Sequence, residues 1–168
     1  MKRPLEPPAD PRQFISYLCV NYIESTGSDQ ASTLFSHIIE LDTTIDNNGF
    51  MILTGKASPH THPAFRLPLD QHPYFVALSI VCRNKHKLFK DEIWWRKYLS
   101  PKQMKEVMEE GENKHCKVVG DVQKLPHAPE VTVHLTLAYE KPKGHHIDQV
   151  YVKFPLSIYF DFYDRMTQ

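Results

Sequence analysis

Two histidines in a proline-rich loop are the first candidates for chemistry in this chain. His60 and His62 lie in the segment Ser58-Pro59-His60-Thr61-His62-Pro63, directly after a predicted strand. Two imidazoles separated by one residue can bind the same divalent metal ion, because imidazole nitrogen is a common ligand of zinc and similar ions. The competing interpretation is a surface loop stiffened by its prolines, with both histidines in solvent.

The order of these residues resembles the first metal-binding motif of the cupin family, in which a strand and a glycine precede an HxH pair. Gly55 stands before the pair here, and Gly120-Asp121, Pro126 and His134 resemble the second cupin motif. The resemblance covers two short segments. It implies that His134 joins His60 and His62 as a ligand of a divalent metal, the only cofactor that the sequence suggests.

A second candidate is His134-Leu135-Thr136, which lies in a predicted strand. Side chains two residues apart share one face of a strand, so His134 and Thr136 point the same way. The pattern resembles half of the 2H phosphoesterase signature, in which two HxT motifs face each other and their histidines act as base and acid. The competing interpretation is a polar sheet face lined by Thr132, His134 and Thr136.

A third candidate is a basic segment. Residues 83–117 contain ten lysines and arginines against six acidic residues. Cations beside exposed aromatic rings can bind nucleic acid or an anionic membrane surface. The competing interpretation is a solvated helix face anchored by core tryptophans. The candidate binding residues are Arg83, Lys85, Lys87, Trp94, Trp95, Arg96 and Lys97.

Three helices are predicted to position these residues. Asp10-Pro11-Arg12-Gln13 is a typical helix start, and apolar residues at spacing four then continue to Gly27. A second helix is predicted over 90–99. A third begins at the capping box Ser100-Pro101-Lys102-Gln103 and ends at Gly111.

Strands are predicted on both sides of the basic segment. Asp46-Asn47-Asn48-Gly49 is typical of a hairpin turn and favours two paired strands within 33–57. A buried strand is predicted over 74–82, and residues 131–139 alternate strictly between apolar and small or polar side chains. A polar turn then leads to a strand at 150–152. Residues 156–163 also alternate, and Pro155 predicts an edge strand or a kink.

These elements predict an α+β fold: one domain over residues 10–168, mainly an antiparallel sheet with an N-terminal helix and two central helices. Residues 1–9 hold three prolines and predict a flexible arm. The 168 residues carry 20 basic and 20 acidic side chains, which argues against a protein that binds polyanions over its whole surface. Only six glycines argue against phosphate-binding glycine-rich loops.

Cysteine usage and the N-terminal residues bear on the compartment. Cys19, Cys82 and Cys116 are far apart and form no CxxC pair, which predicts reduced thiols. The first eleven residues lack the apolar core of a signal peptide, and no apolar run approaches the roughly 20 residues that cross a bilayer. We therefore expect a cytoplasmic or nuclear protein that is not secreted and has no transmembrane segment.

Two functional hypotheses follow. The first is a non-enzymatic interaction or assembly protein that binds a protein partner or a second copy of itself, with Pro155 marking an open sheet edge. Met1 to Pro11 loosely resembles the short basic, proline-rich arm of small viral matrix proteins, which are assembly proteins. The second is a small histidine- or metal-dependent enzyme built on His60, His62 and His134. The sequence favours the first.

Overall fold

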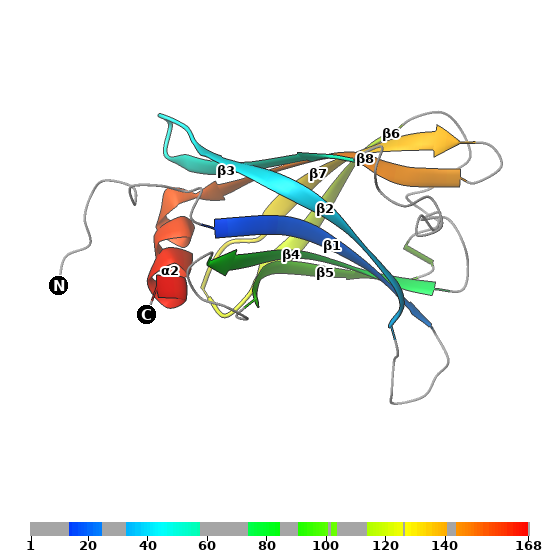
Figure 1. Ribbon diagram of the computed structural model, residues 1–168, viewed down its shortest axis with the longest axis horizontal. Helices are drawn as coiled ribbons and strands as arrows, with labels where there is room; N and C mark the ends of the chain where they lie inside the picture. The colour runs from blue at the N-terminus through cyan, green and yellow to red at the C-terminus, as the bar shows by residue number, and fades with distance from the viewer. Residues whose placement is uncertain are drawn as a thin grey trace.

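Eight antiparallel strands close into one barrel, and a helix follows the last strand (Figure 1). The computed structural model describes residues 14–24, 33–57, 74–84, 91–100, 102–103, 114–125, 127–140 and 144–167. The strands are β1 (Phe14–Glu24), β2 (Thr33–Ile45), β3 (Phe50–Lys56), β4 (Tyr74–Asn84), β5 (Asp91–Leu99), β6 (Lys114–Val122), β7 (Val131–Glu140) and β8 (Gly144–Pro155), and the helix is α2 (Leu156–Thr167). The predicted arm at residues 1–9 lies outside the described residues.

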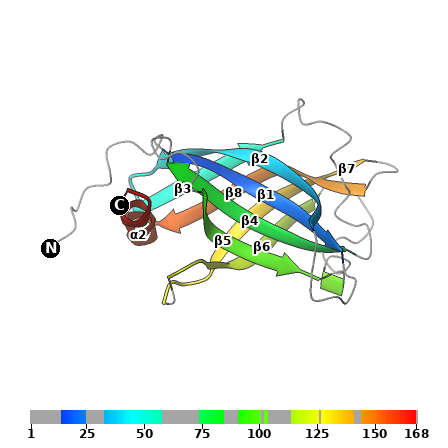
Figure 2. The same ribbon diagram turned by 60° about the horizontal axis from the view of Figure 1, so that its bottom comes forward.

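The strand order around the barrel is β1-β2-β3-β8-β7-β6-β5-β4, and β4 pairs back with β1. Strands that are consecutive in sequence are neighbours except β3 and β4, which lie on opposite sides of the β1-β2 pair (Figure 2). The expectation of an open edge at Pro155 is therefore wrong. β8 pairs with both β3 and β7, and Pro155 lies opposite Phe50 in the register.

The predicted N-terminal helix is wrong, because residues 14–24 form a strand that pairs along its whole length with β4. The spacing-four pattern of Phe14, Leu18 and Tyr22 is also compatible with a period of two. Ser16, Leu18 and Val20 face the interior and are buried. β-branched and aromatic residues dominate this stretch, and their side chains pack well on a pleated surface once a partner strand is present.

The predicted helix over 90–99 is also wrong, because this segment is β5 and pairs with β4. The start of the third predicted helix has the expected local geometry. The Ser100 amide donates to Gln103 Oε1 over 2.9 Å, and the Gln103 amide donates to Ser100 Oγ over 3.2 Å. These are the reciprocal bonds of a capping box. Lys102 and Gln103 are helical, and residues 104–113 lie outside the described part of the chain. The α+β class is replaced by an all-β barrel with a short C-terminal helix.

The predicted hairpin within 33–57 is confirmed as β2 and β3. Asp46 Oδ1 accepts hydrogen bonds from the amides of Asn48 and Phe50, each 3.0 Å long, and this closes the turn. Gly49 completes the turn with φ of +89°, a conformation that favours glycine. The strands predicted at 74–82, 131–139 and 150–152 are confirmed as parts of β4, β7 and β8.

The C-terminal segment 156–163 is a helix rather than the predicted strand. Ile158, Tyr159 and Phe162 are its buried side chains, a helical spacing that keeps one side of α2 against the barrel. Both views show α2 at one end of the barrel (Figures 1 and 2). No helix in the described residues is long and apolar enough to cross a membrane.

Trp94 and Trp95 are consecutive, yet both are buried, with 1% and 0% of their surface exposed. Adjacent side chains of a regular strand point to opposite faces. Here the register with β4 shifts: Trp95 lies opposite Ile80 and Ile93 lies opposite Val81, so Trp94 is the extra residue of a β-bulge. The bulge turns both indole rings into the core.

The two tryptophans hold different parts of the barrel. The Trp94 ring stacks on Phe162 of α2 at 4.2 Å between centroids, so it fixes the helix over the barrel end. The Trp95 indole N–H donates to the Val131 carbonyl over 2.9 Å. Gly120 of β6 makes room for the Trp95 ring, because a Cβ at this position would lie 2.4 Å from a ring carbon.

We predict that Phe162→Ala destabilises the protein by about 3–5 kcal/mol, because it leaves a cavity beneath Trp94. Urea unfolding followed by tryptophan fluorescence measures the loss. Tyr98→Ala is the matched control: Tyr98 is 54% exposed, so its loss should stay within about 1 kcal/mol. If Phe162→Ala does not fold, Phe162→Leu should fold with a smaller loss. Equal stability of the Phe162 and Tyr98 variants would contradict the role given to α2.

Candidate functional site

In the described part of the chain, large side chains pack the interior of the barrel, so its outer surface is the place for a ligand site. Trp94, Trp95, Phe154, Phe162 and Tyr159 are among the largest fully buried side chains. The strands alternate in burial. In β7, Val131, Val133, Leu135 and Leu137 point inward and are buried, whereas His134 points outward and is exposed. A small-molecule cavity at the barrel centre is therefore not the candidate site.

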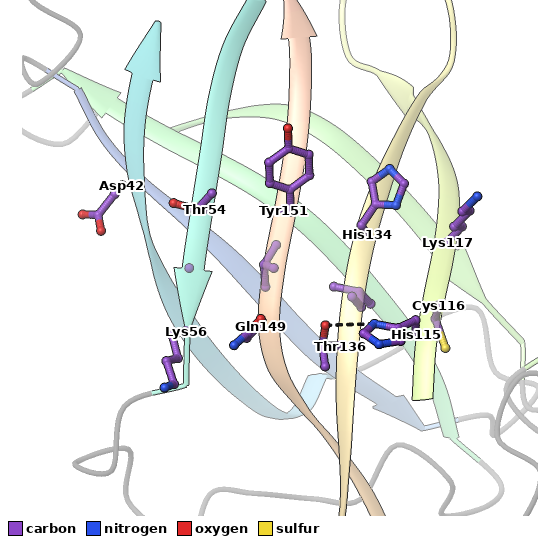
Figure 3. Close-up of a pocket in the computed structure, with 13 residues that line it drawn as sticks. Asp42, Thr54, Lys56, His115, Cys116, Lys117, His134, Thr136, Gln149 and Tyr151 are labelled. Atoms are coloured by element: carbon purple, nitrogen blue, oxygen red, sulfur yellow. Dashed lines mark hydrogen bonds between the residues drawn. The ribbon is translucent and has the colours of Figure 1, made fainter. Parts of the chain in front are cut away.

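A hollow of about 410 Å³ lies on the outer surface of β3, β8, β7 and β6. The side chains that line it are mostly hydrogen-bond donors, and they stand out from neighbouring strands (Figure 3). We call this surface the His134–Tyr151 face. Its outward side chains are Thr54, Lys56, His115, Lys117, His134, Thr136, Gln149 and Tyr151, with Lys153 next along β8.

Two rings occupy the centre of the His134–Tyr151 face. His134 of β7 lies directly opposite Tyr151 of β8, with ring centroids 5.9 Å apart and planes inclined at 61°. On its other side His134 lies opposite Lys117 of β6, and Tyr151 lies opposite Thr54 of β3. One row across four strands therefore places an ammonium group, two rings and a hydroxyl side by side.

The next row of the face is built around Thr136. Thr136 Oγ1 and His115 Nδ1 form a hydrogen bond of 3.3 Å across β7 and β6 (Figure 3). Thr136 lies opposite Gln149, which in turn lies opposite Lys56. The hydroxyl fixes one nitrogen of the His115 ring, which leaves the other nitrogen to interact with a ligand.

A second hollow of about 440 Å³ adjoins the first and shares His134 and Tyr151 with it. It continues toward Phe50, Lys153 and Pro155. The Lys153 ammonium lies 5.3 Å from the centroid of the Phe50 ring, within the range of a cation–π interaction. The two hollows therefore lie next to each other along the outside of β7 and β8, with His134 and Tyr151 between them, and we call them together the groove.

Lysines and histidines outnumber carboxylates in this groove. Its lysines are Lys56, Lys117 and Lys153, and its carboxylates are Asp42 on β2 and Glu130 just before β7. In the strand register the three lysines lie opposite Gln149, Ile52 and His134, so none of these pairings sets a carboxylate against a lysine. The centre of the groove favours a negatively charged ligand.

Of the three predicted metal ligands, the described part of the chain contains His134 alone. His134 lies on the outer surface beside Tyr151, whereas His60 and His62 lie outside the part of the chain that the structure describes. Among the described residues, no three His, Cys, Asp or Glu side chains cluster closely enough to hold a metal ion. Gly120, part of the cupin resemblance, provides space for the Trp95 ring. Three-histidine binding of a divalent metal stays a prediction.

His134 and Thr136 share an outward face, as the HxT pattern predicts. The structure adds His115 from β6, which contacts Thr136 and which the sequence analysis did not select. Two imidazoles on neighbouring strands are the groups that acid–base catalysis uses. Both belong to exposed residues of an open surface, whereas such catalysis gains most where water is excluded.

The basic segment does not form one face in the described residues. Arg83 lies opposite Asp91, and Arg96 lies opposite Asp121 and donates from Nε to Ser79 Oγ over 3.3 Å. Lys97 is half-buried on β5. Trp94 and Trp95 are in the core, so their rings cannot stack on a ligand. Lys85 and Lys87 lie outside the described residues.

Tyr151, Lys117 and His115 were missed because each is unremarkable within its own strand. Alternation along β7 indicated a polar face at Thr132, His134 and Thr136, but a single strand does not reveal what stands beside it. The polar turn after β7 could have indicated Tyr151. A turn there predicts a hairpin of β7 with β8, and this hairpin places His134 near position 150 or 151.

Comparison with protein-family models, with curated proteins and with solved structures finds no match to this chain.

The three cysteines are free, and all have a thiol pKa raised by burial. Cys82 is fully buried, and its Sγ lies 3.2 Å from Ser16 Oγ in the interior. Cys19 and Cys116 are half-buried, and Cys116 lines the first hollow. A raised thiol pKa lowers the thiolate fraction at any given pH, and the thiolate is the reactive form.

We predict that Cys82 does not react with the thiol reagent DTNB in the native protein at pH 8, and that Cys19 and Cys116 react more slowly than free cysteine. Raising the pH to 9 should speed the reaction of the two half-buried thiols, and urea should release the third. Cys19→Ser and Cys116→Ser assign the reacting groups. Rapid reaction of three thiols without denaturant would contradict the described burial.

Proposed function

We propose that this protein is a non-catalytic binding module that takes a negatively charged ligand on the His134–Tyr151 face. The observation that carries the proposal is the groove along β7 and β8. Donor side chains line both of its hollows, and Lys56, Lys117 and Lys153 lie around two outward-facing rings. Charge-assisted hydrogen bonds from ammonium groups to anionic oxygens are stronger than neutral ones, so an anion gains most from this lining.

Binding is favoured over catalysis for a physical reason. The groove is open to solvent, so a charge that develops during a reaction there would be stabilised largely by water. A binding surface has no such requirement, because cations on an open groove still raise the rate at which an anionic partner associates. The net charge of zero is compatible with this function, since the attraction arises locally.

The part of the interaction hypothesis that depended on an open strand edge is withdrawn, because the barrel is closed. The proposed contact surface is a sheet face. We also propose that the protein works in the cytosol or nucleus, and three free cysteines support a reducing compartment.

We predict that the protein binds a heparin hexasaccharide at low salt and that the affinity falls as NaCl rises from 50 to 200 mM, because exposed charges are screened. Isothermal titration calorimetry measures both. Lys56→Gln/Lys117→Gln should weaken binding at least about tenfold, since two charge-assisted contacts are lost.

The matched control is Lys102→Gln/Lys124→Gln, which removes the same charge from exposed lysines that do not line the groove. Its affinity should stay within about twofold of the parent protein. Equal losses from the two pairs would mean that net charge alone matters and would refute the proposed face. Failure of heparin and of other polyanions to bind at 50 mM NaCl would refute the function itself.

A further inference from the structure

We propose that the ligand of the His134–Tyr151 face is a single-stranded nucleic acid, lying along β7 and β8 with its bases against the rings and its phosphates near the lysines. This inference rests on the proposed function, because it identifies the anion that the same groove would bind. It is carried by the length of the groove, by the placement of its rings and by the spacing of its lysines.

The groove is long enough for several nucleotides. Its two hollows share His134 and Tyr151 and extend from Gln149 to Pro155 on β8. Six steps along an antiparallel strand cover about 20 Å, at roughly 3.4 Å for each residue. A single phosphate or sulfate group would occupy only a fraction of this length, so the shape of the groove fits an extended chain.

The rings are placed where bases can reach them. His134 and Tyr151 stand side by side on the outer surface, exposed and half-buried respectively, at the point where the hollows meet. Phe50, also half-buried, lies near the far end beneath Lys153. Unpaired bases stack on aromatic side chains regardless of sequence, because every base has a π-face.

The lysines recur along the same direction. Lys56 lies level with Gln149, Lys117 lies in the row of Tyr151, and Lys153 is two residues further along β8. Successive rows are about 7 Å apart. Cations at three successive levels around a central pair of rings match a ligand that alternates phosphates with planar groups.

Other polyanions use only part of this surface. A duplex keeps its bases stacked inside, so it would meet the lysines but leave the rings without partners. An acidic peptide or heparin would also engage the cations alone. Asp42 and Glu130 at the margins repel any anion, but they can accept hydrogen bonds from the amino groups of unpaired bases.

Fluorescence anisotropy with labelled 12-nucleotide RNA and DNA strands tests the proposal, with the matching duplex, the heparin hexasaccharide and a polyglutamate peptide as comparison ligands. We expect the single strands to bind at least tenfold more tightly than the duplex at equal salt. Tyr151→Leu should weaken single-strand binding by about 5- to 100-fold, the range of a lost base–aromatic stack. Heparin has no bases to stack, so its affinity should fall less than that of the single strands.

Matched variants separate stacking from charge. Tyr151→Phe keeps the ring and removes only the hydroxyl, so it should lose less single-strand affinity than Tyr151→Leu. Lys117→Gln should weaken the binding of both single strands and heparin. For single strands it should also reduce the slope of log affinity against log salt by about 0.7. Lys102→Gln should change neither the affinities nor the slope. Thermal melting checks that each variant is folded, and His134→Ala is the second ring variant if Tyr151→Leu does not fold.

The outcomes distinguish this inference from the proposed function. Heparin binding without a preference for single strands, or ring variants that bind like the parent, would overturn the nucleic-acid assignment and leave the anion-binding function standing. Failure of heparin and of every oligonucleotide to bind at low salt would overturn both. Loss of single-strand binding in Lys102→Gln to the same extent as in Lys117→Gln would overturn the location.

Discussion

The burial of two adjacent tryptophans on one strand shapes much of this molecule. Regular alternation would place either Trp94 or Trp95 in solvent, and the bulge opposite Ile80 and Val81 removes that conflict. Trp94 then stacks on Phe162 and seats α2 at the barrel end, while Trp95 fits against Gly120 and bonds to the start of β7. One irregularity in β5 thereby links the helix, β6 and β7.

A filled interior restricts where function can reside. Because aromatic and branched side chains occupy the space that a wider barrel would leave for a ligand, recognition moves to the outer surface of the strands. The closed barrel also leaves none of the eight described strands at the edge of an open sheet. The candidate in the described residues is a sheet face, the His134–Tyr151 face, on which lysine, histidine, tyrosine and threonine side chains lie side by side across four strands.

A second bulge creates the centre of that groove. Leu137 lies opposite Ile147, but Thr136 lies opposite Gln149, so Asp148 is the extra residue between them. Without this extra residue, the register of Leu137 with Ile147 would continue and place Leu135 opposite Gln149. An apolar and a polar side chain would then share one face of the sheet. The shift pairs Leu135 with Val150 in the core and His134 with Tyr151 outside. The same bulge therefore keeps Leu135 and Val150 in the core and places the His134 and Tyr151 rings side by side outside.

Local signals in the sequence determined several features correctly. The turn at Asp46 to Gly49 predicted the β2-β3 hairpin, and the apolar run at 74–82 predicted a buried strand. The alternation of apolar and polar residues predicted β7 and its polar outer face. The capping box at Ser100 was also predictable. Each depends on contacts between residues that are close in the chain, and for that reason pattern alone sufficed.

Tertiary structure decided the rest. Three segments have apolar spacings that suit both a helix and a strand: 14–24, 91–99 and 156–163. Pairing with β4 makes the first two segments strands. Packing against the end of the barrel makes the third a helix. The candidate site was likewise beyond the sequence, because His115, Lys117, His134 and Tyr151 come from three strands. Strand register, set by bulges that keep apolar side chains in the core, is what brings them together.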